Sequence, residues 1–228
     1  NTAVGNHALS TYNPSSNEDG YNTAIGYAAL DADTTGTKNT ALGSFALAAN
    51  TTATANVAVG YYALSTITTN GGCTAIGNLA LYQNAASNNT AVGDQALEVS
   101  TSGESNTAVG RTALTANTTG QKSTAVGSNS LGAATTGDYN TAVGESAGLD
   151  VTTGGYNTFV GRYAGDDTTT GNRNTCIGYN SGNSNETKVI TVGTDVTSVG
   201  SFYVTLGTDG DGRVYCQYSA NATWNHSS

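Results

Sequence analysis

Residues 106–122 read NTAVGRTALTANTTGQK, and this stretch is one copy of a unit that repeats along the chain. Ten further copies begin at positions 1, 22, 39, 56, 73, 89, 123, 140, 157 and 174. The glycines that end the NTAVG strings are 21, 17, 17, 17 and 16 residues apart, and then 17 residues apart five times. So regular a period indicates a repeat protein in which each unit packs on its neighbours.

The columns of the repeat differ in how much variation they accept. The column before the shared glycine holds only Val, Ile or Leu, and the column before that is Ala except at Phe159 and Cys176. A Leu four residues after the glycine is replaced late in the chain by Gly148, Gly165 and Gly182. The glycine column itself never varies, and we assign it a structural role at turns or at an interface: Gly5, Gly26, Gly43, Gly60, Gly77, Gly93, Gly110, Gly127, Gly144, Gly161 and Gly178.

The unit predicts an all-β fold, a parallel β-solenoid or β-roll of about eleven 17-residue coils. Its Thr-Ala-Val segment alternates with a period of two, which is a strand signal, and no 3.6-residue periodicity is present. Seventeen extended residues span about 56 Å, which suits one flattened coil of two short strands and two turns. One unit cannot bury its apolar side chains alone, so the units must stack.

Stacking turns each column of the repeat into a ladder along the rod. We expect the Val/Ile ladder, which begins with Val4, Ile25, Leu42 and Val59, to form the core together with the Leu ladder. The small residues of the Ala and Gly columns then point the other way. They either fit a narrow coil interior or line an interface between chains, and a three-fold bundle is one closed form of such an assembly.

The repeat resembles the arrays of phage and virus tail-fibre proteins, and it is similar to the head repeats of trimeric autotransporter adhesins. The Ala-Ile-Gly and Ala-Val-Gly strings at 24–26, 75–77 and 142–144 carry the match, which covers about residues 1–182. The resemblance implies a homotrimeric surface fibre for attachment, located outside the cell on a virion or cell surface. The 17-residue period is longer than the usual adhesin head repeat and favours the fibre group.

Two segments depart from the repeat. Residues 10–21 form an insertion with the only proline, Pro14, and we interpret it as a surface loop, either decorative or binding. We divide the chain into a repeat domain, 1–183, and a C-terminal β segment, 184–228, in which strands at 188–193, 201–206 and 213–218 are expected. The Asp-Gly pairs between the last two strands predict a hairpin. This segment either caps the solenoid or forms an aromatic tip.

Composition excludes several classes of function. Charged residues make up 10% of the 228, the net charge is −9, and only seven residues are basic, so the chain is a poor candidate for binding nucleic acid. No apolar run is long enough for a membrane-spanning helix. The absence of an initiator Met predicts a processed chain or a piece of a longer one.

The chain has few residues in patterns suited to catalysis or metal binding. The two histidines, His7 and His226, lie near the termini, and His7 occupies a variable column that indicates a surface position. Asp166-Asp167 and Asp209/Asp211 are the available carboxylate pairs, and nothing selects either for a glycan-cleaving site. The segment 209–212 resembles the start of a calcium loop, but a Glu is missing at its twelfth position. We therefore expect no enzyme activity, no cofactor and no metal.

Cys73 and Cys176 are predicted not to pair with each other. Cys73 and Cys176 lie six coils apart, about 29 Å along the rod, which far exceeds the reach of a disulfide. Cys176 replaces a core-like Ala and is expected to be buried, whereas Cys73 replaces Asn at a turn and is expected to be exposed. A link from Cys216 to a neighbouring chain stays open.

The leading hypothesis is a structural and adhesive fibre, with a glycan or protein receptor contacting the variable columns after the glycine. Exposed aromatic side chains stack on sugars and pack on proteins. The candidates are Tyr27, Phe45, Tyr61, Tyr62, Arg111, Arg162, Tyr163 and Tyr179, each of which is alternatively decoration on a spacer rod.

Two alternatives remain. The first is ice binding through the Thr ladder, which begins with Thr2, Thr23, Thr40 and Thr74. Because these threonines share a strand face with the Val column, we expect them to point inward, which counts against ice binding. The second is a glycan-cleaving fibre enzyme, for which the sequence offers only the unselected carboxylates.

Overall fold

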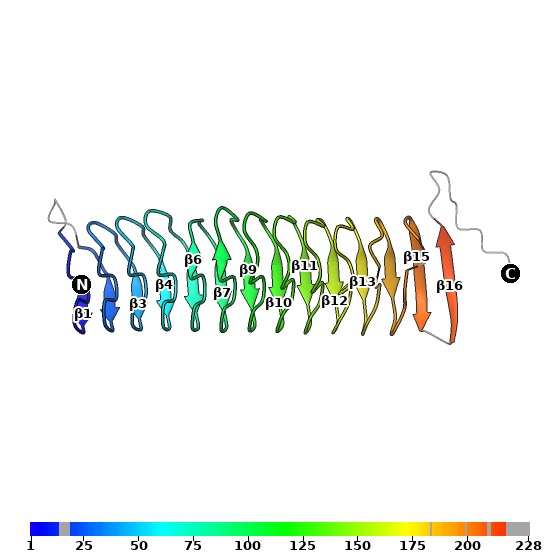
Figure 1. The fold of residues 1–228 in the computed structure, drawn as a ribbon, viewed down its shortest axis with the longest axis horizontal. Coiled ribbons are helices and arrows are strands. Elements are labelled where there is room, and N and C mark those ends of the chain that lie inside the picture. Colours follow the sequence, from blue (N-terminus) through cyan, green and yellow to red (C-terminus); the bar gives the residue numbers. More distant parts are fainter. Residues whose placement is uncertain (14–18, 183, 199, 209–210, 218–228) are drawn as a thin grey trace.

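The computed structural model is an all-β rod, a parallel β-solenoid of about twelve turns, and confirms the predicted fold class. The structure describes residues 1–13, 19–182, 184–198 and 200–208, together with the backbone of 211–217. Figure 1 shows the coils stacked in a single file, with β1 at one end of the rod and β15 near the other. One sheet of fourteen strands runs the length of the rod, and thirteen of its strands are parallel.

Each coil contributes one three-residue strand to this sheet, and neighbouring strands pair in register. Thr107, for example, pairs with Thr124, and Ala108 with Ala125. A second sheet of only two strands lies elsewhere on the coil wall, formed by β6 (Gln83–Asn84) and β8 (Val99–Ser100). The strands of the long sheet are, in order, β1 (Thr2–Val4), β2 (Thr23–Ile25), β3 (Thr40–Leu42), β4 (Val57–Val59), β5 (Thr74–Ile76), β7 (Thr90–Val92), β9 (Thr107–Val109), β10 (Thr124–Val126), β11 (Thr141–Val143), β12 (Thr158–Val160), β13 (Thr175–Ile177), β14 (Ile190–Val192), β15 (Tyr203–Thr208) and β16 (Asp211–Gln217).

The invariant glycine stands where the chain leaves the strand, and its place in the stack explains why no other residue occurs there. Gly60 has φ +138°, and a Cβ atom on it would lie 2.2 Å from the carbonyl oxygen of Gly77 in the next coil. Successive coils touch backbone to backbone at this corner, so any side chain would push them apart.

The prediction that the Val/Ile column forms the core is wrong. Ala24, Ala58 and Ala108 of the middle strand position are fully buried, whereas Val4 and Ile25 of the position that follows it are 57% and 38% exposed. The strand turns its alanine inward, and its Thr and Val side chains therefore both point outward. The small residues fit a narrow coil interior, which removes the surface on which an Ala-lined interface between chains would depend.

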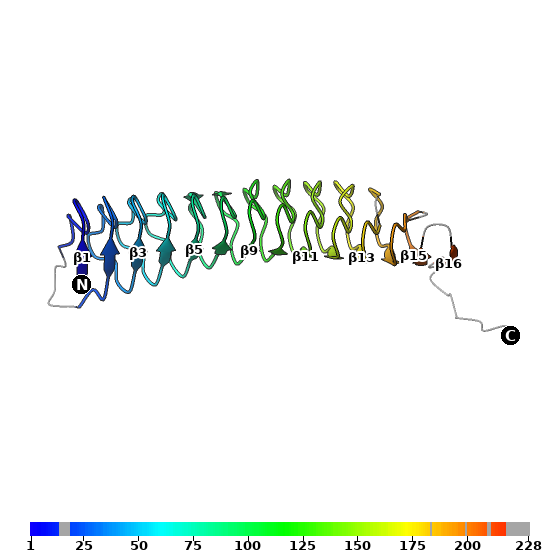
Figure 2. The same ribbon diagram turned by 90° about the horizontal axis from the view of Figure 1, so that it is seen from below.

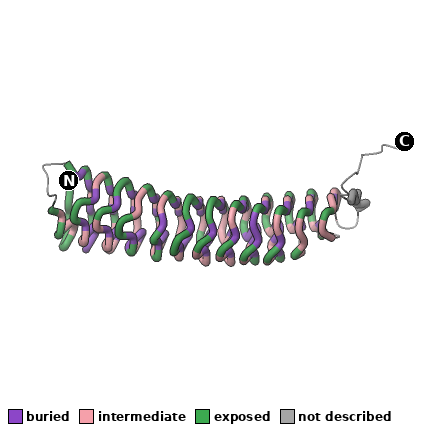
Figure 3. Tube along the Cα trace, turned by 90° about the horizontal axis from the view of Figure 1, so that it is seen from above, coloured by how far each residue is buried: buried purple, intermediate pink, exposed green. Residues whose placement is uncertain are grey.

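The Leu column is buried, as predicted. Leu64 and Leu114 are at most 1% exposed, and both have the left-handed backbone conformation, with φ +52°. They reach across the coil to the inward alanines, and together the two columns make one continuous hydrophobic core. Figure 3 shows buried segments recurring in every coil along the rod.

A buried ladder of asparagines, which the repeat pattern marks only as turn residues, joins the coils. Asn106 Nδ2 donates to the Gly120 carbonyl oxygen (2.8 Å) and so closes its own coil, while its Oδ1 accepts from the Ser123 backbone N–H (2.9 Å) of the next coil. Asn39, Asn140 and Asn157 make the same two kinds of bond. One side chain thereby satisfies two backbone groups that would otherwise be buried without partners.

The change from Leu to Gly late in the chain keeps the core filled. A Cβ atom on Gly165 would lie 2.2 Å from Phe159 Cε1, and one on Gly148 would lie 2.7 Å from Phe159 Cδ2. The Phe159 ring, which is fully buried, therefore occupies the space of two missing leucines. The parallel sheet continues beyond this change through β13, β14 and β15.

The coils shorten toward the C-terminus without ending at residue 183. β14 and β15 pair in parallel with their predecessors, and their glycines, Gly193 and Gly207, follow at intervals of 15 and 14 residues. β15 then pairs with β16 in antiparallel fashion, which confirms the predicted hairpin. The outward positions here become wholly apolar, since Ile190 and Val204 replace the threonine.

Two of the three cysteines can be assigned, and both are free thiols. Cys176 is buried, as predicted, and burial raises the pKa of its thiol to about 12. The prediction that Cys73 is exposed is wrong, because Cys73 takes the place of an inward asparagine and is fully buried. Its Sγ donates to the Ala86 carbonyl oxygen at 3.3 Å. The side chain of Cys216 lies outside the described residues.

Candidate functional site

The outer face of the long sheet is the most extensive regular surface of the molecule. From β1 to β13, each strand of this sheet except β4, which has Val57, places a Thr and a Val, Ile or Leu on this face, and in-register pairing lines both residue types up along the rod. Figure 2 shows the strands of this sheet side by side along one side of the rod. The prediction that the threonines point inward is wrong: Thr40, Thr107 and Thr124 are partly exposed on the outer face.

The aliphatic half of this surface is an exposed stripe that begins at the first coil and continues to β14. We call it the aliphatic stripe. Its members that are at least 36% exposed are Val4, Ile25, Leu42, Ile76, Val126, Val143, Val160, Ile177 and Val192. Val59, Val92 and Val109 complete the stripe and are partly exposed.

A second surface is an aromatic ladder over the first five coils. Tyr27 lies edge-on to Phe45 (centroids 5.2 Å apart), Phe45 stacks on Tyr62 (4.6 Å), and Tyr61 lies edge-on to Tyr62 (4.5 Å). His7 and Tyr82 extend the ladder at its two ends. The structure thus brings four predicted receptor candidates together and adds His7, whose predicted surface position is confirmed.

Three further receptor candidates form a separate group near the C-terminal end. Arg162 Nε pairs with Glu145 Oε2 at 2.9 Å, and the guanidinium carbon lies 4.4 Å from the Tyr163 ring centroid. Tyr179 lies edge-on to Tyr163, with centroids 6.3 Å apart. Arg111 belongs to neither group, since its neighbours in the stack are Asp94 and Ser128.

The sequence-based candidates do not include a third group, in the column just before the repeat asparagine. Its N-terminal half is a stack in which Lys122 Nζ lies 5.2 Å from the Tyr139 ring centroid, Tyr139 stacks on Tyr156 (4.9 Å), and Arg173 lies 5.7 Å from Tyr156. Lys188 Nζ lies 4.8 Å from the Phe202 ring in the following coils. Its members are 17 residues apart from Lys122 to Arg173 and then 15 and 14 residues apart, so the available signal is a recurrence of Lys, Arg, Tyr and Phe at one column rather than of a single residue type. We call this set the cation–aromatic row: Lys122, Tyr139, Tyr156, Arg173, Lys188 and Phe202.

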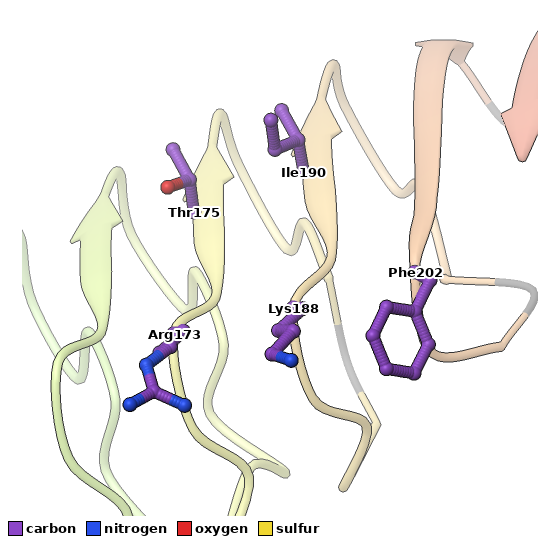
Figure 4. A pocket seen from close by; sticks show the side chains of 5 residues that line it. All are labelled: Arg173, Thr175, Lys188, Ile190 and Phe202. Atoms are coloured by element: carbon purple, nitrogen blue, oxygen red, sulfur yellow. The ribbon is translucent and has the colours of Figure 1, made fainter. Parts of the chain in front are cut away.

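A pocket of about 280 Å³ opens at the C-terminal end of the cation–aromatic row (Figure 4). Arg173, Lys188 and Phe202 line one side of it, and Thr175 and Ile190, from the outer face of the sheet, line the other. The pocket therefore lies where the row meets the edge of the sheet face.

The remaining candidate sites from the sequence are carboxylate pairs and groups of metal-binding residues. The described residues contain no group of three or more His, Cys, Asp or Glu that could hold a metal ion. Asp166 and Asp167 are consecutive on the rod, and burial, followed by the charge of Asp167, raises the pKa of Asp166. The calcium-like loop at 209–212, His226 and the centre of the 10–21 insertion lie outside the residues whose side chains are described. Across the described part of the chain, no helix is long and apolar enough to cross a membrane.

Comparison with known proteins returns no match to a protein-family model, a curated protein or a solved structure. The features of the chain that bear on its function are therefore the repeat and the surfaces described above.

Proposed function

We propose that the chain is a non-enzymatic structural and adhesive fibre, a rigid rod that associates as a homotrimer and attaches to a host or surface receptor. The rod form supports this proposal, because each coil is fixed to the next by backbone pairing, asparagine bonds and a shared core. Such a stack resists bending and holds whatever it carries on its surface at a fixed distance from its base.

The observation that carries the proposal is the aliphatic stripe. The twelve members span eleven coil spacings, so at about 4.8 Å per coil the stripe is about 53 Å long, and threonines adjoin it along most of its length. Nine side chains that are 36–57% exposed make a contiguous apolar surface at least comparable to the largest apolar patches of monomeric proteins, which often are interaction sites. A straight stripe along a rod is matched best by the same stripe on another copy, lying alongside.

The resemblance to fibre and adhesin repeats supports three copies, with the stripes turned toward a common axis. In that arrangement the aromatic ladder over the first coils stays available for a receptor. Closed symmetry also covers each stripe completely and prevents open-ended association.

Light scattering in solution tests the assembly. A homotrimer gives a mass three times the 22.8 kDa of one chain. A mass of 22.8 kDa that persists at high protein concentration would overturn the trimer and leave the stripe uncovered.

Ice binding is the second candidate function, and the outward threonines favour it. Thr107 and Thr124 pair in register on the outer face, so their hydroxyl and methyl groups repeat at about 4.8 Å along the rod. A regular array of this kind can order water if no other chain covers it.

A thermal-hysteresis and ice-shaping assay of the whole chain tests this candidate. Thr124→Tyr in the middle of the face should abolish activity, whereas Thr119→Tyr, at an exposed turn, should not. Absence of ice shaping by the unaltered chain would remove ice binding from consideration.

A further inference from the structure

The geometry points to a binding site for a carboxylated linear polysaccharide along the cation–aromatic row. This inference rests on the proposed attachment function and deepens it, because it names a class of ligand and the residues that bind it.

Positive charge is concentrated in this column to a degree that the acidic composition does not explain. The chain has 16 acidic and seven basic residues, and four of the seven (Lys38, Lys122, Arg173 and Lys188) occupy the one column. The backbone N–H of each donates to the preceding coil in the same way, which shows that they are equivalent positions. Lys122, Arg173 and Lys188 lie within the cation–aromatic row and give it a local positive charge on a rod whose net charge is −9, whereas Lys38 lies five coils before Lys122 and outside the row.

Arg173 and Lys188 form the centre of the site. They lie on adjacent coils, about 4.8 Å apart along the rod, and both are exposed. The one ion pair among the described residues joins Arg162 to Glu145, so within that part of the chain neither cation has a carboxylate partner. An anion placed between them would relieve the repulsion between the two like charges.

The pocket beside these two cations has the chemistry of a sugar site. Phe202, which is 45% exposed, and Ile190 supply an apolar wall, and Thr175 supplies a hydroxyl. A sugar ring can lay its C–H face on the Phe202 ring while its carboxylate meets Arg173 and Lys188 (Figure 4). Its hydroxyl groups would find Thr175 and the phenol oxygens of the row.

The stack in the row favours a polysaccharide over a nucleic acid. Tyr139 and Tyr156 lie face to face with 13° between their planes, Arg173 lies over the outer face of Tyr156, and Lys122 Nζ donates to the Tyr139 hydroxyl at 3.1 Å. Bases bind to single-strand-binding proteins by stacking on open aromatic faces, and the two inner faces and the outer face of Tyr156 are already occupied. The Tyr139 hydroxyl accepts from Lys122 Nζ and can still donate, and both tyrosines are exposed (43% and 56%), so their ring edges and hydroxyl groups suit hydrogen bonding to sugar hydroxyls.

The length of the row suits an extended chain. From Lys122 to Phe202 it crosses six coils, so it is about 24 Å long. The spacing between coils is close to the length of one sugar unit in an extended polysaccharide, so successive units can meet successive coils. Lys122 lies near the charge of Asp138, which makes the Arg173 end the stronger part of the site for an anion.

Isothermal titration calorimetry of the whole chain with a galacturonate hexamer tests the inference. We expect binding that weakens with salt and is lost with the carboxyl-reduced hexamer. Arg173→Ser and Lys188→Ser should each weaken binding by about tenfold or more, because each removes a charged hydrogen-bond donor. Serine is accommodated at this column, as Ser105 shows with φ +61°.

Lys38→Ser is the matched control, since it removes the same charge from the same column far from the pocket. It should leave affinity within about twofold of the unaltered chain. Equal weakening by Lys38→Ser, equal binding of the neutral hexamer, or no binding at millimolar concentrations would each overturn the inference. Tighter binding of a twelve-residue thymidine oligonucleotide through Arg173 and Lys188 would overturn it in favour of nucleic acid. A rod that is trimeric yet fails this test retains the proposed fibre function and loses only this ligand.

Discussion

At the scale of single residues, the coil interior is narrow and contains polar groups, so each buried polar side chain needs hydrogen-bond partners. Within the described part of the chain, Asp33 is the one acidic side chain buried fully inside it. Its oxygens accept from the Gly36 backbone N–H (3.0 Å), Asn50 Nδ2 (2.8 Å) and Asn22 Nδ2 (3.1 Å). Burial outweighs these bonds and raises the pKa of the carboxyl from 3.8 to about 6.

Asp33 should therefore make stability depend on pH. In the unfolded chain the carboxyl loses its proton near pH 3.8, but in the folded chain it keeps the proton until about pH 6. The free energy of unfolding consequently falls as pH rises between these values and stays lowered above pH 6. Denaturant titrations from pH 4 to 8 measure this fall, for which two pKa units set an upper limit of about 3 kcal/mol.

The variant Asp33→Asn should remove most of that pH dependence and be the more stable protein at pH 8, by roughly 1–2 kcal/mol. Asn is accommodated at this column, since Asn117 donates there to the Gly120 carbonyl oxygen at 2.9 Å. Glu104→Gln, at an exposed position, is the control and should change little. An unchanged pH profile in Asp33→Asn would show that Asp33 is not the group responsible.

The two bonds of each ladder asparagine predict that different substitutions of Asn106 destabilise the rod to different extents. Asn106→Ala leaves the Gly120 carbonyl and the Ser123 N–H without partners in the interior and should destabilise the rod by about 2–4 kcal/mol. Asn106→Ser should cost less, because the natural Ser123 still accepts from the Asn140 N–H through its hydroxyl (3.2 Å). Denaturant unfolding of the whole chain measures both.

The converse change, Ser123→Asn, should stabilise the rod by about 1 kcal/mol, because it restores the bond that closes the coil. Stability equal to or below that of the unaltered chain would contradict the two-bond role assigned to the ladder.

At the scale of the element, one coil is a unit of fixed interior volume that two columns share. The Phe159 side chain, which stands in the Ala column, fills the space that a Leu side chain would take at Gly165 in its own coil and at Gly148 in the coil before. Phe159→Ala should therefore leave a cavity and cost about 3–5 kcal/mol.

The loss should be largely recovered in the triple variant Phe159→Ala/Gly148→Leu/Gly165→Leu. Gly148 and Gly165 have φ +60° and +64°, near the +50° at which Leu131 stands in the same column. Gly165→Leu alone is the control: it should be destabilising, because its Cβ atom would meet the Phe159 ring. Thermal unfolding of the three variants separates these outcomes, and a triple variant no more stable than Phe159→Ala would refute the exchange.

At the scale of the whole molecule, the aliphatic stripe connects structure to assembly. If trimer formation buries it, Val109→Lys/Val126→Lys should shift the scattering mass to that of one chain, because unpaired charges would be buried. Both residues point outward, so the fold of each coil should remain, as circular dichroism can check.

The control for this experiment is Ser102→Lys/Thr119→Lys, which adds the same two charges to exposed turns of adjacent coils. This variant should stay trimeric, because neither position lies on the stripe. A monomeric control would indicate charge repulsion rather than loss of the stripe.

Much of the architecture is predictable from the repeat, whereas the orientation of the strand is not. A 17-residue period with one alternating segment per copy is enough to predict stacked coils, turn glycines and a buried Leu column. It does not predict which side of Thr-Ala-Val faces inward, since both alternatives keep the period of two. Hydrophobicity alone favours Val inside, and this preference accounts for the wrong core and the inward threonines. The wrong prediction for Cys73 has another cause, since its column was taken for an exposed turn and is the buried asparagine ladder.

The candidate surfaces, too, were predictable from the sequence only in part. Tyr27, Phe45, Tyr61 and Tyr62 were predictable because they share variable columns after the glycine, but their union with His7 and Tyr82 depends on side-chain directions in neighbouring coils. The cation–aromatic row is harder to predict because its column mixes cations with aromatic residues, so no single residue type marks it. Arg111 was a receptor candidate because it occupies one of these variable columns, but its neighbours in the stack are not aromatic.

The repeat is sufficient to make this protein a rod, because a short unit that recurs with little change can bury its apolar groups only against copies of itself. What the rod shows to its surroundings depends on the folded coil. Where leucine fills the coil, the space behind the strand admits little more than a methyl group, so alanine stands there and the valines and threonines become the outer face. Phe159 occupies that position where Gly148 and Gly165 replace the leucines.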